Sequence, residues 1–296
     1  MLEHACGRWI SFIDGDDLLA PSAADTIRKY QDEAFDIIYF DIVFFRYAKS
    51  IPAYVIDLAP TVIDEENKAA LILTTLYPTR TDPKYVNKTI PKIMGKIFRM
   101  DFLRRHALTY DEALRKSQDV AFNLVCLQHI RQAEIVREPI YYYRQNQGSI
   151  VSRYNENILR YNLNLVQAFA EIVAGFDGSL REALTERYYL MAMIILKSTL
   201  KLNMCHRKNP KSKAQRRQDF EQLIGMDWCQ EALRRCNTAL LNKSDRIVYD
   251  CAGRRDFDAL CKYFRQCDRQ NSLKIFANRL GLNKIANRIR QKKSVR

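Results

Sequence analysis

Short apolar runs alternate with amphipathic segments throughout the first 154 residues. Strand patterns are predicted at residues 9–14, 36–47, 54–58, 93–99, 133–137 and 139–144, and helix patterns at 22–33, 65–76, 101–106 and 119–132. The 36–47 segment is rich in β-branched and aromatic residues, which suits a long strand. Strands that alternate with helices in this way predict an α/β fold, with a mixed sheet flanked by helices.

The remaining residues, 155–296, have helical periodicity almost throughout. Two long helices are predicted at residues 157–174 and 180–202, and further helices at 218–225, 227–241, 256–268 and 272–291. The polar, basic stretch 206–217 is interpreted as a linker or exposed loop. We therefore predict two regions, an α/β domain over residues 1–154 and a mostly α-helical, basic region over residues 155–296.

Positive charge is concentrated in the last third of the chain. Residues 1–205 carry 25 Lys or Arg and 25 Asp or Glu, whereas residues 206–296 carry 23 against nine, which accounts for the whole formal net charge of +14. Residues 272–296 hold no acid and form a basic amphipathic pattern, which suits peripheral contact with an anionic membrane. The alternative is a solvated helix packed on its own domain.

The composition also favours a cytoplasmic protein with reduced cysteines. No apolar run approaches the ~18 to 20 residues that span a bilayer, and the N-terminus has no signal-peptide pattern. We expect a cytoplasmic location, at most peripheral at the inner face of the cell membrane. The eight cysteines form no CxxC pair, so they are interpreted as buried thiols rather than as a zinc site.

An acidic cluster follows the first apolar run. The run at residues 9–13 ends at Asp14, Asp16 and Asp17, three carboxylates within four positions. Like charges at a strand end repel unless they share a cation, and carboxylate oxygens are suited to Mg²⁺ or Mn²⁺. Gly15 lets the backbone turn between the acids. The alternative is an ordinary turn that closes the strand, with Ser22 capping the next helix.

Four sequence blocks in this order resemble the family 2 glycosyltransferases, whose domain has the GT-A fold. The first block is GRWISFIDGDDLLAPSAADTI at residues 7–27, similar to the family's metal-binding segment. MGKIFRMDFL at 94–103, followed by LTYDE, is similar to the family's KLFRRDFL block. SQDVAF at 117–122 and PIYYYR at 139–144, followed by GSI, complete the resemblance over roughly residues 4–155. It implies a partial, Rossmann-like GT-A sheet, as in bacterial capsule and exopolysaccharide glycosyltransferases.

The resemblance also implies roles for individual residues. Asp14 and Asp16 would bind Mg²⁺ or Mn²⁺, Asp14 would also lie near the nucleotide-sugar donor, and Asp17 would extend this donor-binding cluster. Asp119 matches the catalytic base that takes the proton of the acceptor hydroxyl. A helix N-cap is the alternative role for Asp119. Gln118 stands where the family has Glu; it supports Asp119 without charge.

Two basic residues and a tyrosine run complete the candidate site. Lys96 and Arg144 are predicted to contact the donor, with an ordinary ion pair as the alternative for each. At least one tyrosine of the run at 141–143 is expected to pack in the core. In the family, a further strand–helix half precedes the acidic motif and builds the nucleotide pocket. Its absence here predicts an N-terminally truncated domain of weak stability and activity.

The leading functional hypothesis is a metal-dependent glycosyltransferase. It would move a sugar, with inversion, from a nucleotide-sugar donor to a glycan or lipid-linked glycan acceptor. A second hypothesis is a catalytically impaired fragment that acts as a binding or assembly module. A third, an anion- or nucleic-acid-binding protein, rests only on the basic C-terminus, and no nucleic-acid-binding motif accompanies it, so nucleic acid is not expected as a partner.

Overall fold

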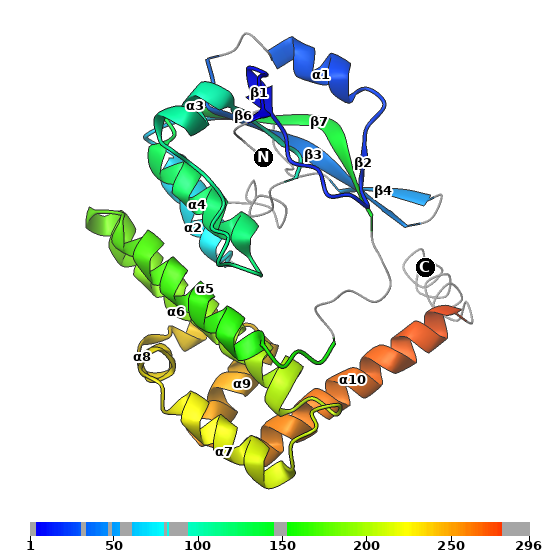
Figure 1. Cartoon of the computed structure of the whole chain (residues 1–296), viewed down its shortest axis with the longest axis vertical. Helices are drawn as coiled ribbons and strands as arrows, with labels where there is room; N and C mark the ends of the chain where they lie inside the picture. Colours follow the sequence, from blue (N-terminus) through cyan, green and yellow to red (C-terminus); the bar gives the residue numbers. More distant parts are fainter. Residues whose placement is uncertain are drawn as a thin grey trace, which may run out of the picture.

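A mixed sheet and a layer of helices form the two halves of the protein (Figure 1). The computed structural model describes residues 4–30, 34–46, 49–53, 61–79, 82, 94–144 and 153–279. The strand predicted at residues 54–58, most of the loop predicted at 77–92 and the C-terminal segment after residue 279 lie outside the described residues. Side chains are described as far as Leu273, so most of the predicted membrane-contact segment 272–296 is also outside them.

The sheet has seven strands in the order β1-β6-β3-β7-β2, with β4 paired to β3 and β5 paired to β7. Only the central pair, β3 and β7, is parallel among the described strands, and the other pairs are antiparallel. The strands are β1 (Trp9–Ile10), β2 (Leu18–Leu19), β3 (Ile37–Arg46), β4 (Lys49–Ala53), β5 (Thr61–Ile63), β6 (Lys96–Arg99) and β7 (Ala133–Arg144).

Strand β3 is buried on both faces, as its composition predicts. Ile37 and Tyr39 point into one core, whereas Ile38, Phe40 and Ile42 point into a second core on the opposite face. This division follows from the two-residue period of a strand. A central strand with apolar side chains on both faces requires helices on both faces, which is what the structure shows.

One helix covers the second face and three cover the first. Helix α1 (Ala23–Tyr30) packs over Phe40, while α2 (Lys68–Leu76), α3 (Met100–Arg105) and α4 (Gln118–His129) lie on the face of Ile37 and Tyr39. Gly95 precedes β6 with a φ of 70°, and a Cβ there would lie 2.6 Å from Cγ1 of Ile42. The close approach of this turn to β3 therefore requires glycine.

The second half is built around one long helix. Helix α6 (Gly178–Thr199) continues into a π-helical turn, η3 (Leu200–Met204), and contributes to two cores. Leu184 and Ile195 join the core shared with the sheet, whereas Leu190, Met193 and Leu196 join a core within the helical half. The other elements are α5 (Ile158–Ala174), α7 (Lys213–Ile224), α8 (Asp227–Arg235), η4 (Thr238–Leu240), α9 (Lys243–Gly253) and α10 (Phe257–Arg279).

Several predicted boundaries were wrong. The two strands predicted at 133–137 and 139–144 are one strand, β7, whose register shifts where Pro139 lies opposite Asp41. The strand predicted at 9–14 ends at Ile10. Two predicted helices, 256–268 and the start of 272–291, are the single helix α10, and α9 was not predicted. Helix α3 begins at Met100, one residue before its predicted start.

Six of the eight cysteines are buried, and all eight are free thiols, as predicted. None of the helices in the described part of the chain is long and apolar enough to cross a membrane. The boundary at residues 154 and 155 stays a prediction. Helices α5 and α6 share a core with α2 and α4 across it, which indicates that the two halves stabilise each other.

This shared core predicts that the sheet and the helices unfold together. Phe169 on α5 is fully buried in it, so Phe169→Ala should lower the free energy of unfolding by about 3–5 kcal/mol. The measurement is urea unfolding followed by circular dichroism and by tryptophan fluorescence, and both signals should shift together in one transition.

The matched control is Gln167→Ala, an exposed position on the same helix, which should change stability by less than about 0.5 kcal/mol. Two separate transitions, of which only one responds to Phe169→Ala, would contradict a single cooperative unit.

Candidate active site

The acidic motif forms a tight turn between two short strands. The N–H of Asp17 donates to the carbonyl of Asp14 at 3.1 Å, which closes a four-residue turn after β1 and before β2. The side chains of Asp14 and Asp16 are exposed, whereas Asp17 is buried. A Cβ at Gly15 would meet no atom within 4 Å, so the turn itself does not require glycine there.

Tyr141 joins the two ends of this turn. Its hydroxyl donates to Oδ2 of Asp17 at 2.7 Å and accepts from the N–H of Asp14 at 3.0 Å. The side chain is fully buried, as expected for one member of the tyrosine run. Burial raises the pKa of this phenol, so it stays protonated and able to donate.

Arg144, at the end of β7, is held against the same turn. Its N–H donates to Oδ1 of Asp17 at 2.6 Å, and its Nε donates to the carbonyl of Asp16 at 2.6 Å. Both carboxylate oxygens of Asp17 therefore accept hydrogen bonds from β7. The guanidinium also lies over the ring of Phe45, 4.9 Å from its centroid. The Arg144 side chain is nevertheless exposed, beside the two exposed acids.

Asp119 lies in the first turn of α4. Ser117 is the N-cap residue, in a left-handed conformation with a φ of 52°, and its side chain makes no capping hydrogen bond. Oδ1 of Asp119 accepts from the N–H of Val120 at 2.9 Å, and its carbonyl accepts from Asn123 at 2.8 Å. A carboxylate in the first turn of a helix is stabilised by the helix dipole. The N-cap alternative for Asp119 is thus wrong, while its catalytic role stays a prediction.

The two motifs converge on two tyrosines. Burial raises the pKa of Tyr143, and the carboxylates of Asp17, Asp14, Asp16 and Asp119 raise it further. A second phenol, Tyr110, has its pKa raised by burial and then by Asp119, Cys126 and Asp14. Carboxylates of the acidic turn and Asp119 at the start of α4 thus both contribute to the raised pKa of each tyrosine.

Aromatic packing holds this arrangement in place. The ring of Tyr110 stacks on Phe122 of α4, with centroids 4.5 Å apart and planes 4° apart. Phe12, just before the acidic turn, makes edge contacts with Tyr110, Phe122 and Phe98 at 5.4–5.7 Å. Edge-to-face and offset pairs of this kind favour one relative position of their rings. They connect the segment that leads into the acidic turn to the helix that carries Asp119.

Lys96 is buried beneath the site rather than open to it. Its side chain is 1% exposed, and its Nζ lies 5.1 Å from the centroid of the Tyr39 ring. Burial lowers the pKa of Lys96 to about 7, and the nearby Asp119 partly offsets this shift. The contact of Lys96 with a donor stays a prediction, and its almost complete burial argues against that contact.

The exposed acids suit a divalent cation only together with other ligands. No group of three or more His, Cys, Asp or Glu side chains among the described residues is arranged to hold a metal ion by itself. Mg²⁺ is commonly bound by one or two carboxylates, with water and substrate phosphates as its remaining ligands. Asp14 and Asp16 fit that pattern, because both carboxylates are exposed on one turn.

Three features of the site were not anticipated from the sequence. The bridging role of Tyr141, the position of Tyr110 beside both acidic motifs, and the burial of Lys96 all emerge from the fold. The sequence does contain a signal for the burial of Lys96, because a charged residue in an otherwise apolar strand needs a partner when it is buried. Tyr141 and Tyr110 had no such signal, since their partners are distant in sequence.

The fold is that of a solved glycosyltransferase. S. aureus TarS, residues 1–349, in complex with UDP-GlcNAc superposes with a TM-score of 0.54 and 14% identity, covering 91% of this chain and 70% of that one. The same segment of TarS in complex with UDP gives a TM-score of 0.51 and 13% identity, covering 91% and 69%. This likeness confirms the predicted GT-A fold with a helical C-terminal region.

The chain is also similar in sequence to a curated glycosyltransferase. The uncharacterized glycosyltransferase EpsJ of Bacillus subtilis (strain 168) is 24% identical over 155 residues, which is 50% of this chain and 41% of EpsJ. The chain thus spans about two fifths of that relative's length in the alignment. No family model matches the chain.

The Tyr141 bridge predicts a measurable loss of stability. Tyr141→Phe keeps the ring but removes the hydroxyl, which leaves Oδ2 of buried Asp17 and the N–H of Asp14 without this partner. The free energy of unfolding should fall by about 1–3 kcal/mol in urea titrations. Tyr142→Phe, one residue along the same strand and half-buried, is the control and should be near neutral; equal effects of both variants would contradict the bridge.

The burial of Lys96 predicts a pH-dependent contribution to stability. With a folded pKa of about 7 and an ordinary pKa of 10.5, the unfolded chain binds the Lys96 proton between these values and the folded chain does not. The contribution of Lys96 to the free energy of unfolding therefore rises with pH from about 7 to 10, with a slope approaching about 1.4 kcal/mol per pH unit.

Lys96→Met removes this titration, so the unfolding free energy of wild type minus that of Lys96→Met should increase between pH 7 and pH 9. Subtracting the variant cancels the titration of the buried tyrosines and cysteines, which is common to both proteins. Lys262→Met, at an exposed position, should show no such increase. A difference that stays flat for Lys96→Met would show that Lys96 is solvated.

Proposed function

We propose that the chain is a nucleotide-sugar-dependent glycosyltransferase that transfers a sugar to a glycan or lipid-linked glycan acceptor. The observation that carries the proposal is the packing of Phe12 on Tyr110 and Phe122, which connects the segment before the acidic turn to the helix of Asp119 on a GT-A fold. TarS has been crystallised with UDP-GlcNAc and with UDP. A uridine diphosphate sugar is therefore the donor class to test first.

Asp14 and Asp16 would hold Mg²⁺ or Mn²⁺ together with the donor diphosphate. When bound, such an ion neutralises the diphosphate and stabilises the charge that develops on the leaving nucleotide. The exposure of both carboxylates supports this role, since a cation held there stays accessible to a phosphate. Asp17 would act by positioning, because both of its oxygens accept hydrogen bonds from β7. The exposed guanidinium of Arg144 would contact the donor.

Asp119 would be the catalytic base. As the acceptor hydroxyl attacks the anomeric carbon, its proton passes to the Asp119 carboxylate, and the bond between the sugar and the diphosphate breaks. Attack from the side opposite the leaving group inverts the anomeric centre. The half-exposed position of Asp119 supports this role, because a base must reach an incoming hydroxyl. The ammonium of Lys96 beneath it would steady the carboxylate, and Gln118 would add a neutral hydrogen-bonding group.

Single substitutions distinguish the proposed role of Asp119 as base from that of Asp16 as metal ligand. Asp119→Asn should lower kcat by about 10²–10⁴-fold, the usual contribution of a general base, while the affinity for UDP changes little. Asp16→Asn should instead raise the Mn²⁺ concentration needed for half-maximal activity. The measurement is the release of UDP from UDP-sugars in the presence of a glycan acceptor extract, with donor binding followed by calorimetry.

The matched control is Asp101→Asn, an exposed acid on α3, which should leave all three quantities unchanged. Full turnover by Asp119→Asn would contradict its role as base. Metal-dependent UDP binding by the wild type without product from any donor would favour a binding module over a transferase.

A further inference from the structure

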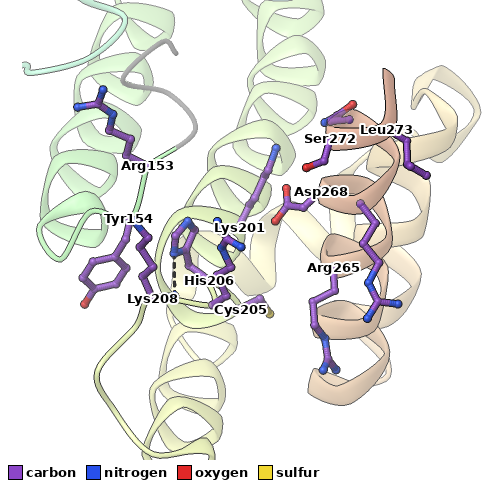
Figure 2. Close-up of a pocket in the computed structure, with 13 residues that line it drawn as sticks. Arg153, Tyr154, Lys201, Cys205, His206, Lys208, Arg265, Asp268, Ser272 and Leu273 are labelled. Atoms are coloured by element: carbon purple, nitrogen blue, oxygen red, sulfur yellow. Dashed lines mark hydrogen bonds between the residues drawn. The ribbon is translucent and has the colours of Figure 1, made fainter. Parts of the chain in front are cut away.

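A basic cleft lies in the helical half, away from the acidic motif. Its cavity volume is about 1660 Å³, and three segments of the chain line it (Figure 2). They are residues 153–154 before α5, the region of η3 and the loop that follows, and the last described turns of α10. The lining residues are Arg153, Tyr154, Lys201, Cys205, His206, Arg207, Lys208, Arg265, Asp268, Arg269, Asn271, Ser272 and Leu273.

The side chains that line this cleft are predominantly positive. Six of the described lining residues are Lys or Arg, and Asp268 is the one acid among them. Lys201 comes from η3 and Arg265 from α10, on different sides of the cleft (Figure 2). Nε of Arg265 donates to the carbonyl of Cys261 at 3.1 Å, which orients its guanidinium along the helix.

Three basic residues outside the cleft, on or just before α7, pair with acids of the protein. Lys211 pairs with Asp219 at 2.7 Å, and Lys213 and Arg217 both pair with Asp258. No ion pair to a described residue forms at Lys201, Arg207 or Lys208. Six basic residues thus face a single acid, Asp268, in the described lining of the cleft. Like charges gathered in a concavity repel, so they favour an anionic occupant from outside the chain.

We propose that this cleft binds a linear anionic polymer through its phosphate groups. Guanidinium groups match phosphate oxygens bidentately, and Arg outnumbers Lys in the lining. The site is concave, whereas a lipid bilayer presents a broad surface. Tyr154 is the single Phe, Tyr or Trp among the described lining residues, and single-stranded nucleic acids are usually held on several stacking aromatics. These features favour a phosphate chain, and the inference is independent of transferase activity.

The test measures binding of fluorescein-labelled inorganic polyphosphate to the purified full chain by anisotropy. The double variant Lys201→Gln/Arg265→Gln should weaken binding by about tenfold or more, as expected for the loss of two charged contacts. Its affinity should also depend less steeply on salt. Arg207→Gln/Lys208→Gln, in an exposed loop, should have the same effect without any cost to folding.

The matched control is Arg181→Gln/Lys262→Gln, which removes the same charge from exposed positions outside the cleft, one of them on α10. It should change affinity by less than about twofold. Equal weakening by control and cleft variants would overturn the proposal, because binding would then follow net charge alone. So would tighter binding of single-stranded DNA of equal charge, or binding to phosphatidylglycerol vesicles without binding to polyphosphate.

Discussion

The hydrogen bonds of the Tyr141 hydroxyl connect the acidic motif to the centre of the sheet. The motif follows a two-residue strand and precedes another, so its own secondary structure is too short to fix it. Pairing of β2 with β7 brings Tyr141 beneath the turn, where one hydroxyl joins Asp14 and Asp17. Buried Asp17 thereby orients the turn that carries the exposed side chains of Asp14 and Asp16. Of the three carboxylates, that of Asp17 is held by hydrogen bonds from β7, whereas Asp14 and Asp16 stay exposed.

The same sheet places a buried cation near the second motif. Lys96 belongs to β6, which pairs with β3 at the centre of the fold, and its amine lies against Tyr39 and near Asp119. Burying a charge is costly unless a counter-charge is near, so Lys96 and the first turn of α4 constrain each other. Phe12, Tyr110 and Phe122 then connect that turn to the segment entering the acidic motif. Aromatic packing and one buried amine thus link two motifs that are far apart in sequence.

Sequence patterns predicted most of the elements but few of the contacts that build the site. The apolar segment 36–47 was placed correctly as β3 because burial on both faces leaves a pattern that needs no partner to be recognised. Strand β2 was missed, since Leu18 and Leu19 are about half exposed and two residues carry no period. Helix α9 was missed although Asn242 caps it through the N–H groups of Ser244 and Asp245, a signal the sequence does contain.

The corrected C-terminal helices matter for the cleft. Because α10 is one helix, it carries Arg265 and Arg269 along a single rigid side of the cavity. The facing side begins where α6 becomes π-helical, and Lys201 belongs to this turn, η3. Since α6 also packs against the sheet-side helix α2, the basic cleft and the sheet are attached to the same helix, about 33 Å long. An anionic chain held in the cleft would therefore keep a fixed relation to the acidic motif.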